Sequence, residues 1–504
     1  MNYLNNTILD KIKRPIRVLQ FGQGNFIRGF ADLMIDIANE RGVFNGDIVI
    51  VKPTKSAGDL DVYKKQDFLY TVVLKGIENG KVKKFNHIVK SIADIVHPYL
   101  EYEKYAELTK IKTLRFVISN TTEAGIVYDD KDTIDMKPPN SFPGKLTKFL
   151  YERYIYFKGD KDKGLIILPL ELIDNNGDEL KNVIMKYIKL WNLEEGFLNW
   201  LDEACEFCNS LVDRIITGFS DEYALAVWEE LGYRDDLLVA GETFGLWAIQ
   251  DINNISSEFP LHKANQSVIF TKDLSPYELR KVRILNGAHI AFALASYLSD
   301  NDYVLESMED QDIRTFMTKA IYDEIIPSLD LPKDDLTAFA DSVIERFRNP
   351  YNKHPLLSIS LNGVSKWKYR ILPSILDYID HKGELPFMLT FSIAALIEFY
   401  RGLKEQDNGV YVNKRHGEEY LILDDNSVIE FFKINSQMDD EVLVKSFLSV
   451  EEFWDQDLNK LPGFSEAVRS YLRDINDLGM REAIRKVNSM AMKGTPYYAG
   501  SNKD

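Results

Sequence analysis

Arg17-Val-Leu-Gln-Phe21-Gly22-Gln-Gly24-Asn25-Phe-Ile-Arg28-Gly29 is the stretch that decides the fold of this chain. It begins as a buried parallel strand and then opens a helix that is expected to run to about Asn39. Strand, glycine turn and helix in this order are the context of a dinucleotide-binding motif. Gly22 permits the tight turn, Gly24 lets the backbone approach a pyrophosphate, and the N-terminus of the helix supplies N–H donors.

The motif is incomplete. The third glycine of the usual fingerprint is missing, because Ile27 stands in its place. A second apolar strand, residues 47–51, follows at the right distance, but no acidic residue stands at its end to bind a ribose 2′-hydroxyl. Lys52 stands there and would even tolerate a 2′-phosphate. The motif therefore predicts a nicotinamide dinucleotide without choosing between NAD and NADP.

The rest of the N-terminal half alternates between strands and helices. Residues 68–74 and 83–89 alternate like antiparallel strands and look like an insertion in the nucleotide-binding sheet. Residues 114–120 and 164–170 return to the pattern of buried parallel strands. This alternation predicts an α/β fold class, with a Rossmann-like doubly wound sheet in a domain formed by residues 1–272.

From Ser275 onward helical periodicity replaces the alternation. We expect an all-helical, substrate-binding and catalytic domain in residues 273–504. A length of 504 residues agrees with more than one domain. Helices are predicted at residues 275–298, 311–326, 333–348, 366–381 and 385–404, with a further series to about residue 491.

The composition limits what the protein does. No apolar run approaches the roughly 18 residues needed to cross a bilayer, and the first residues lack the form of a signal peptide. A net charge of −17 argues against nucleic acid or an anionic membrane as a partner. A small anionic substrate could still bind in a locally basic pocket. We therefore expect a cytoplasmic enzyme, either a monomer or a small homo-oligomer.

The chain has only two cysteines, Cys205 and Cys208, in a stretch with a helical pattern. One Cys-x2-Cys pair lacks the second half of a zinc site, and so few cysteines suit a reducing compartment. We expect two ordinary buried thiols and no metal.

A second informative stretch is Lys281-Val-Arg-Ile-Leu-Asn286-Gly-Ala-His289, in a segment from Ser275 to about Leu298. The segment begins with a Ser-Pro pair and is apolar nearly all the way round, which predicts a buried helix. At about 100° per residue, His289 falls roughly 80° and Asn286 roughly 140° around the helix from Lys281. The three polar side chains could therefore share one broad face that lines a cleft.

These residue types suit the transfer of a proton to a carbonyl oxygen. A desolvated lysine can have its pKa lowered toward neutrality, which would let Lys281 act as a general acid or base. Asn286 could donate a hydrogen bond to a developing alkoxide, and His289 could hold a substrate hydroxyl or carbonyl. Alternatively, Lys281 extends to solvent while Asn286 and His289 are core polar groups with partners.

The longest stretch without an aspartate or glutamate runs from Arg346 to Leu376. It is a candidate to hold an anionic group such as a carboxylate. It could equally be a solvated face that pairs with acids elsewhere. Its basic residues are Arg346, Arg348, Lys353, His354, Lys366, Lys368 and Arg370.

The Lys-x4-Asn-x2-His pattern of residues 281–289 resembles the signature of the long-chain polyol dehydrogenases typified by mannitol dehydrogenase. In that family the lysine is the acid/base, the asparagine polarises the reacting oxygen and the histidine contacts the substrate. The resemblance covers nearly the whole chain and implies an NAD cofactor without a metal. Its other motifs are the turn with Phe26 and Arg28, the loop with Thr122 and Glu123, Leu211-Val-Asp213-Arg-Ile215, Asn349-Pro350 and Gly363-Val-Ser-Lys366.

Some substitutions set this chain apart from the mannitol enzymes. Leu172 replaces a second asparagine that completes the family's oxyanion site, and Ser358 replaces an arginine that contacts the substrate. Residues 169–177 resemble the subgroup that acts on hexuronates, which implies interconversion of tagaturonate and altronate. Mannitol, fructuronate and a sugar phosphate are the alternative substrates. The alternative to an enzyme is a protein that keeps this fold and binds the nucleotide but is catalytically silent.

The motifs assign a role to each candidate site residue. As catalytic residues we expect Lys281, Asn286 and His289; as cofactor-binding residues Gly22, Gly24, Asn25, Phe26, Ile27, Arg28, Lys52, Thr122 and Glu123; and as substrate-binding residues Asp213, Arg346, Lys353, His354 and Lys366. Asp213 could equally form a structural ion pair with Arg214, Glu242 could face the cleft or merely cap a turn, and the Thr122 loop could be an ordinary strand-to-helix turn.

Overall fold

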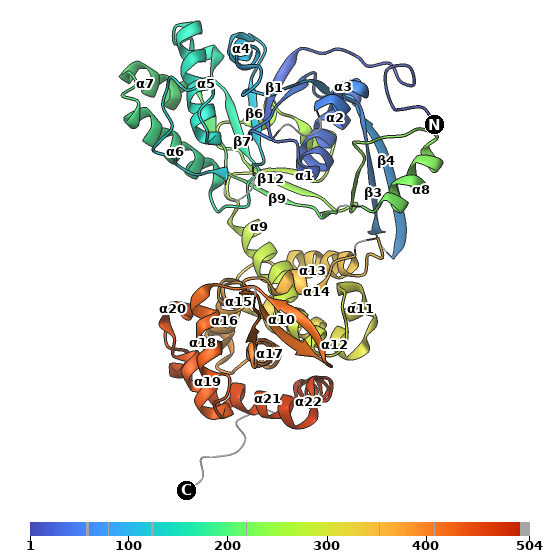
Figure 1. The fold of residues 1–504 in the computed structure, drawn as a ribbon, viewed down its shortest axis with the longest axis vertical. Coiled ribbons are helices and arrows are strands. Elements are labelled where there is room, and N and C mark those ends of the chain that lie inside the picture. Colours follow the sequence, from blue (N-terminus) through green and yellow to red (C-terminus); the bar gives the residue numbers. More distant parts are fainter. Residues whose placement is uncertain are drawn as a thin grey trace. The chain divides into compact units, whose positions relative to one another are not determined.

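A computed structural model describes residues 1–56, 60–78, 80–121, 125–217, 219–351, 353–407 and 409–493. The chain divides into two units (Figure 1). The N-terminal unit comprises residues 1–76 and 82–277, and the C-terminal unit comprises residues 77–81 and 278–504.

The N-terminal unit is built on a six-stranded sheet with the order β5-β2-β1-β6-β7-β8. Its neighbouring strands are all parallel. Counted along the chain within this sheet, the order is 3-2-1-4-5-6, which is that of the doubly wound dinucleotide-binding fold. The predicted fold class is confirmed. The strands are β1 Ile16–Phe21, β2 Asp47–Val51, β5 Ile92–Val96, β6 Phe116–Ser119, β7 Ile166–Pro169 and β8 Glu206–Phe207.

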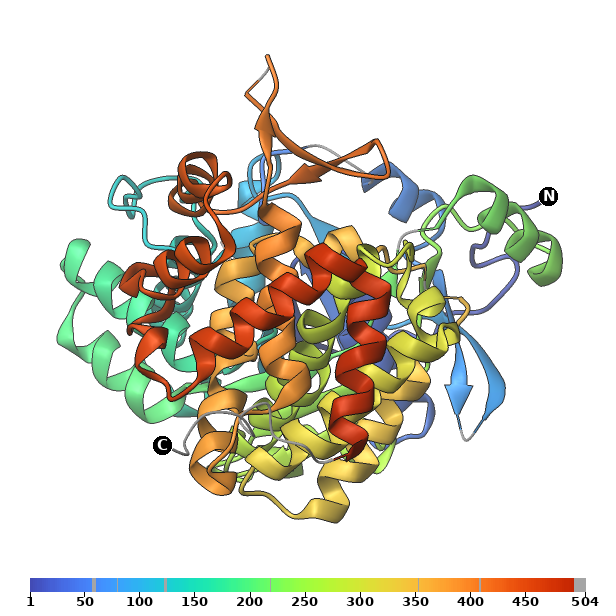
Figure 2. The same ribbon diagram turned by 90° about the horizontal axis from the view of Figure 1, so that it is seen from below.

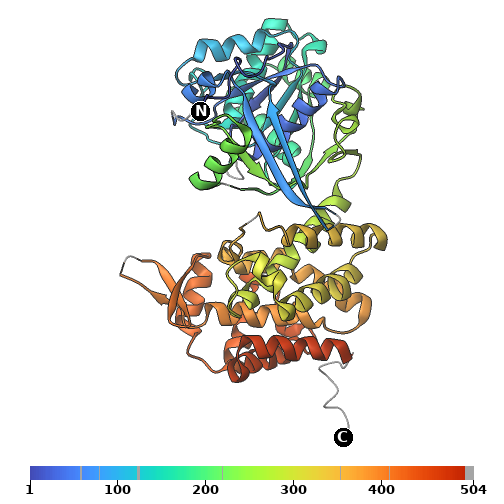
Figure 3. The same cartoon turned by 90° about the vertical axis from the view of Figure 1, so that its right-hand side faces the viewer.

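Helices cover both faces of this sheet (Figures 1 and 3). On one face α2 (Leu33–Glu40) packs with strand residues such as Val18 and Ile48. On the other face α5, α6 and α7 pack with Leu19 and Val49. Adjacent strand residues thus point to opposite cores, as expected for a sheet buried on both sides. The three helices are α5 Phe142–Phe157, α6 Asn176–Leu190 and α7 Glu195–Ala204.

Strands β3 (Tyr70–Glu78) and β4 (Lys81–Val89) come between β2 and β5 along the chain, as expected for an insertion in the nucleotide-binding sheet, but they do not extend that sheet. They belong to a separate four-stranded sheet with the order β10-β11-β3-β4. The reason is that β3 pairs with β11, which lies more than 150 residues further along the chain, so no local pattern reveals the pairing. The other strands here are β9 Ser210–Asp213, β10 Ile216–Thr217, β11 Val239–Gly241, β12 Leu246–Gln250 and β13 Val268–Thr271.

The two cysteines are free and buried, which confirms the expected thiols. Burial raises the pKa of Cys205 to about 12 and also raises the pKa of Cys208. Their expected place on a helix is wrong. Helix α7 ends at Ala204, Cys205 already has extended backbone angles, and Cys208 follows β8.

The C-terminal unit is mainly helical, with the almost wholly buried α10 (Gly287–Tyr297) and α17 (Phe387–Tyr400) in its core. It is not all-helical, because β14 Lys404–Glu405, β15 Tyr411–Arg415 and β16 Glu418–Ile422 form a small antiparallel sheet. Figure 2 shows this sheet projecting from the helices. None of the helices in the described ranges is both long and apolar enough to cross a membrane.

Most predicted helices of this unit are present. They include α12 Gln311–Lys319, α13 Lys333–Phe347, α14 Leu356–Ser360, α15 Gly363–Arg370, α16 Leu372–Lys382, α21 Phe464–Leu478 and α22 Met480–Lys493. The helix predicted from Ser275 is divided into α9 (Ser275–Arg280), a π-helical turn η7 (Lys281–Asn286) and α10.

Candidate active site

The glycine turn after β1 admits no side chain at Gly22. This residue has a φ of 118°, and a Cβ there would lie 2.6 Å from the carbonyl oxygen of Asn120, which follows the neighbouring strand β6. The backbone therefore turns tightly at the carboxyl edge of the sheet. That edge is where ligands bind in folds of this kind.

A continuous helical run from Asn25 to Glu40 starts directly after the turn. Its N-cap residue is Gly24, which has no side chain to accept a hydrogen bond from the first N–H groups. These donors suit a phosphate. The run therefore fits the predicted pyrophosphate site.

The other predicted residues of this turn also have structural roles within the fold. Ile27 is fully buried, and Phe26 stacks on Phe30 with ring centroids 4.9 Å apart. The buried Arg28 guanidinium donates to the Leu237 carbonyl and to Asn25 Oδ1, the latter at 2.6 Å. The side chain of Ile27 cannot reach a ligand, so any contact from it would come from its backbone.

Further predicted residues follow the carboxyl ends of β2, β6 and β7. Lys52 is buried, and its N–H donates to the Val96 carbonyl of the neighbouring strand. Thr122 and Glu123 lie outside the described residues. Leu172 is 58% exposed, and its side chain offers no hydrogen-bonding group for an oxyanion.

Sequence reasoning missed the buried carboxyl of Glu171. It accepts hydrogen bonds from Ser119 Oγ and from the N–H of Thr121, both at 2.9 Å, and burial raises its pKa. Glu171 thus ties together the ends of β6 and β7. Its position directly after the apolar strand β7 was the signal that could have identified it.

Two of the residues around β9 mainly hold the fold. The Arg214 guanidinium donates to the carbonyls of Phe244 at 2.8 Å and Gly29 at 2.9 Å. Glu242 Oε1 accepts from the Ile215 N–H at 2.7 Å, as expected for a residue that caps a turn. Asp213 is buried at the end of β9.

The π-helical turn changes the expected arrangement of the catalytic candidates in the C-terminal unit. The Gly287 N–H donates to the carbonyl of Val282, five residues back. A π turn contains one more residue than an α turn. The residues that follow it are therefore rotated back by about 100° around the helix axis, compared with their positions in a regular α-helix. Asn286 is then about 40° from Lys281 and His289 about 20° to the other side, instead of the roughly 140° and 80° of a regular α-helix. The three residues therefore share a narrow face.

Gly287 allows α10 to pack closely on the end of α15. A Cβ at this position would lie 3.0 Å from the carbonyl oxygen of Arg370. Lys281 and Asn286 on the same helical segment are partly buried. The position of Lys281 therefore agrees with a group that is shielded from bulk water.

His289 is buried against the ring of Phe347, with centroids 4.1 Å apart, and lies edge-on to His354. Its Nε2 has no hydrogen-bond partner among the described residues. Burial lowers the pKa of His289 well below its ordinary value, and the positive or partly positive side chains around it add to this effect. The imidazole is therefore neutral near pH 7 and can accept or donate one hydrogen bond at Nε2.

The groups that lower the pKa of His289 are His354, Arg346, Arg370 and Lys366, which we call the basic cluster. Three of the predicted substrate-binding residues thus lie near enough to His289 to lower its pKa, together with Arg370, which sequence reasoning had noted only as part of the acid-free segment. Lys366 also donates to the Ile359 carbonyl at 3.0 Å. Lys353 is exposed, and Asp213 belongs to the N-terminal unit.

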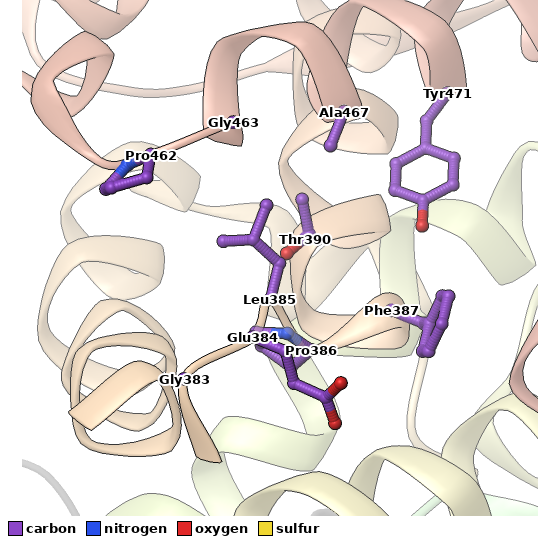
Figure 4. Close-up of a pocket in the computed structure, with 10 residues that line it drawn as sticks. All are labelled: Gly383, Glu384, Leu385, Pro386, Phe387, Thr390, Pro462, Gly463, Ala467 and Tyr471. Carbon is purple, nitrogen blue, oxygen red and sulfur yellow. The ribbon is translucent and has the colours of Figure 1, made fainter. Parts of the chain in front are cut away.

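A separate pocket of about 560 Å³ lies in the C-terminal unit. Figure 4 shows it between the turn at residues 383–387 and the start of α21, with Leu385 pointing toward Pro462. None of the predicted site residues lines it. It is therefore not part of the candidate active site.

Comparison with known proteins extends this picture to the whole chain. The model of the mannitol dehydrogenase Rossmann domain matches residues 16–263, and that of the mannitol dehydrogenase C-terminal domain matches residues 273–476. The altronate oxidoreductases of Shigella flexneri and Escherichia coli O139:H28 are each 43% identical over 492 residues, covering 96% of this chain and 99% of theirs.

Solved structures show the same fold. The ternary complex of Pseudomonas fluorescens mannitol 2-dehydrogenase with NAD and D-mannitol has a TM-score of 0.71 at 21% identity, covering 98% of this chain and 100% of that one. A substrate-free D-sorbitol dehydrogenase has a TM-score of 0.78 at 21% identity, covering 96% and 100%. Because both domain models match in order and the relatives match almost end to end, the chain belongs to the mannitol dehydrogenase family.

Proposed function

We propose that this protein is an NAD-dependent altronate oxidoreductase, which interconverts tagaturonate and altronate. The observation that carries the proposal is the basic cluster beside His289, on the helical segment that also bears Lys281 and Asn286. A cluster of cations suits the carboxylate of a hexuronate and has no comparable use for a neutral polyol. The 43% identity to altronate oxidoreductases over nearly the whole chain supports the same substrate.

The residues of the N-terminal unit fit a dinucleotide. Gly22 and Gly24 leave bare backbone at the carboxyl edge of the sheet, and the N–H groups that follow Gly24 have no side-chain cap. A pyrophosphate would occupy this position. Bound NAD would exchange a hydride with the carbonyl carbon of the sugar acid.

The chain's own residues handle the proton and the charge. Lys281 gives a proton to the carbonyl oxygen during reduction and takes it back during oxidation. Asn286 donates a hydrogen bond to the same oxygen as negative charge develops on it. The neutral His289 orients a substrate hydroxyl or the reacting oxygen through Nε2. Arg346 and Lys366 of the basic cluster hold the carboxylate.

The test is NADH consumption with tagaturonate, fructuronate, fructose and sugar phosphates, by wild type and by Lys281→Ala. We expect turnover with tagaturonate above all others. Lys281→Ala should lose most turnover, because the proton donor is gone, and should still bind NADH as judged by fluorescence. Full activity of Lys281→Ala would refute its role, and NADH binding without turnover of any substrate would identify a silent nucleotide-binding protein.

Two further properties remain predictions from the sequence. We expect the enzyme to act in the cytoplasm and to be a monomer or a small homo-oligomer. Size-exclusion chromatography with light scattering measures the second directly.

A further inference from the structure

Arg283 lies inside the π-helical turn that carries Lys281 and Asn286, and it is 5% exposed. It follows Lys281 by two residues, which is about half a turn of helix and places it on the opposite side. Its side chain therefore leaves the turn away from the catalytic face. It has no place in the mechanism described above.

The Arg283 guanidinium is anchored to a neighbouring helix. Its Nε donates to Ser374 Oγ at 2.6 Å and its Nη2 to Asp377 Oδ2 at 2.5 Å, both on α16. A longer bond of 3.4 Å joins Nη2 to Ser328 Oγ. All of these contacts lie within the C-terminal unit. Charge-assisted bonds from a buried arginine fix both the position and the orientation of its guanidinium.

Contacts from outside the helix help to hold a π turn, because it is rare and less favourable than the α-helix on either side of it. If the turn relaxed to α geometry, Asn286 and His289 would rotate by about 100° relative to Lys281. The proton donor and the hydrogen-bond donor would then no longer reach the same oxygen.

We propose that Arg283, through Ser374 and Asp377, is a positioning residue that holds the π turn and thereby keeps Lys281 aligned with Asn286 and His289. This inference rests on the catalytic roles given under the proposed function. It assigns Arg283 no contact with substrate or cofactor.

The experiment compares Arg283→Met, Arg283→Lys and Arg401→Met in the full-length enzyme. Arg401 is the matched control, because it forms an arginine–aspartate pair with Asp440 at 2.7 Å in the same unit, outside the π turn. Measured are kcat and KM for tagaturonate, the solvent deuterium isotope effect on kcat, NADH binding and the unfolding midpoint.

Arg283→Met should lower kcat by about 10- to 100-fold, because a misplacement of about 1 Å can cost that much. KM should change by less than about 3-fold, since the basic cluster remains, and the solvent isotope effect should rise as proton transfer becomes slower than the other steps. Arg283→Lys should recover part of kcat, because it keeps one charged bond. Arg401→Met should lower the unfolding midpoint without changing kcat or the isotope effect.

An unchanged kcat in folded Arg283→Met, or a fall in kcat with an unchanged isotope effect, would overturn the inference. If Arg283→Met does not fold, Asp377→Asn gives the same test, because the Asp377 side chain is 47% exposed and its change is isosteric. The failure of the catalytic roles is distinguishable: Lys281→Ala would then be active. An inactive Lys281→Ala together with a fully active Arg283→Met would refute the positioning role alone.

Discussion

Replacing Lys366 by methionine tests the proposed recognition of a carboxylate. Lys366 and Lys368 both lie on helix α15, but only Lys366 belongs to the basic cluster. Lys368 instead pairs with Asp455 at 2.7 Å. The pair Lys366→Met and Lys368→Met therefore removes the same charge from the same helix, once inside the cluster and once outside it.

The magnitude follows from the bonds that are lost. A hydrogen bond to a charged group contributes about 1.5–3 kcal/mol, so the loss of one lysine–carboxylate contact should lower kcat/KM for tagaturonate by about 10- to 150-fold. A neutral ketose makes no such contact, and its kcat/KM should change by less than about 2-fold. The lost bond to the Ile359 carbonyl should cost about 1 kcal/mol of folding stability.

The assay is NADH oxidation with tagaturonate and with a neutral ketose for both variants, together with proton NMR titration of the histidines. Burial and Lys366 both lower the pKa of His354, so the pKa should rise in Lys366→Met. Lys368→Met should leave it in place. An equal loss of kcat/KM for the uronate and the ketose would refute the reasoning, because it would show damage to the site in general.

Two further predictions concern the glycine turn and a buried carboxyl. Gly22→Ala should destabilise the fold by at least about 1–2 kcal/mol, because a non-glycine residue is strained at that φ and its Cβ would contact the Asn120 carbonyl. A Cβ at Gly24 contacts nothing, so Gly24→Ala should weaken only NADH binding. Equal unfolding midpoints for the two variants would contradict this. Burial raises the pKa of Glu324 from 4.5 to about 8, so the folded state binds the proton more tightly than the unfolded state does. The free energy of unfolding should therefore fall, by up to about 5 kcal/mol, as the pH rises from about 4.5 through 8. Glu324→Gln should remove this slope in urea unfolding from pH 5 to 9, and an unchanged slope would contradict it.

The parallel sheet was predictable because its signals are local. Strands such as β1 and β2 are buried on both faces and read as continuous apolar runs, and Gly22 marks the turn. The second sheet was not predictable, since β3 pairs with a strand that is distant in the sequence. The cysteines were misplaced for a related reason: nothing in the sequence marks the end of α7 at Ala204.

The three catalytic candidates were found by residue type, but their geometry could not be derived. A π turn shifts the polar face of an amphipathic helix around the axis. The segment around Lys281 is apolar nearly all the way round, so it has no polar face in which such a shift could be seen. In the structure, the bond from the Gly287 N–H to the Val282 carbonyl identifies the π turn, and the Arg283 side chain anchors the segment that contains it. That anchor depends on α16, about 90 residues away, which no local pattern could supply.

Under the proposed function, the basic cluster connects the charge of the site with its choice of substrate. Its side chains disfavour a positive charge on His289, and Lys366 has the same effect on His354. The segment from Arg346 to Leu376 itself contains no aspartate or glutamate. The positive charge of the cluster would attract a carboxylate more strongly than a hydroxyl in the same place. Burial and the basic cluster both lower the pKa of His289, and under the proposed function the same cluster would favour a sugar acid over a neutral sugar.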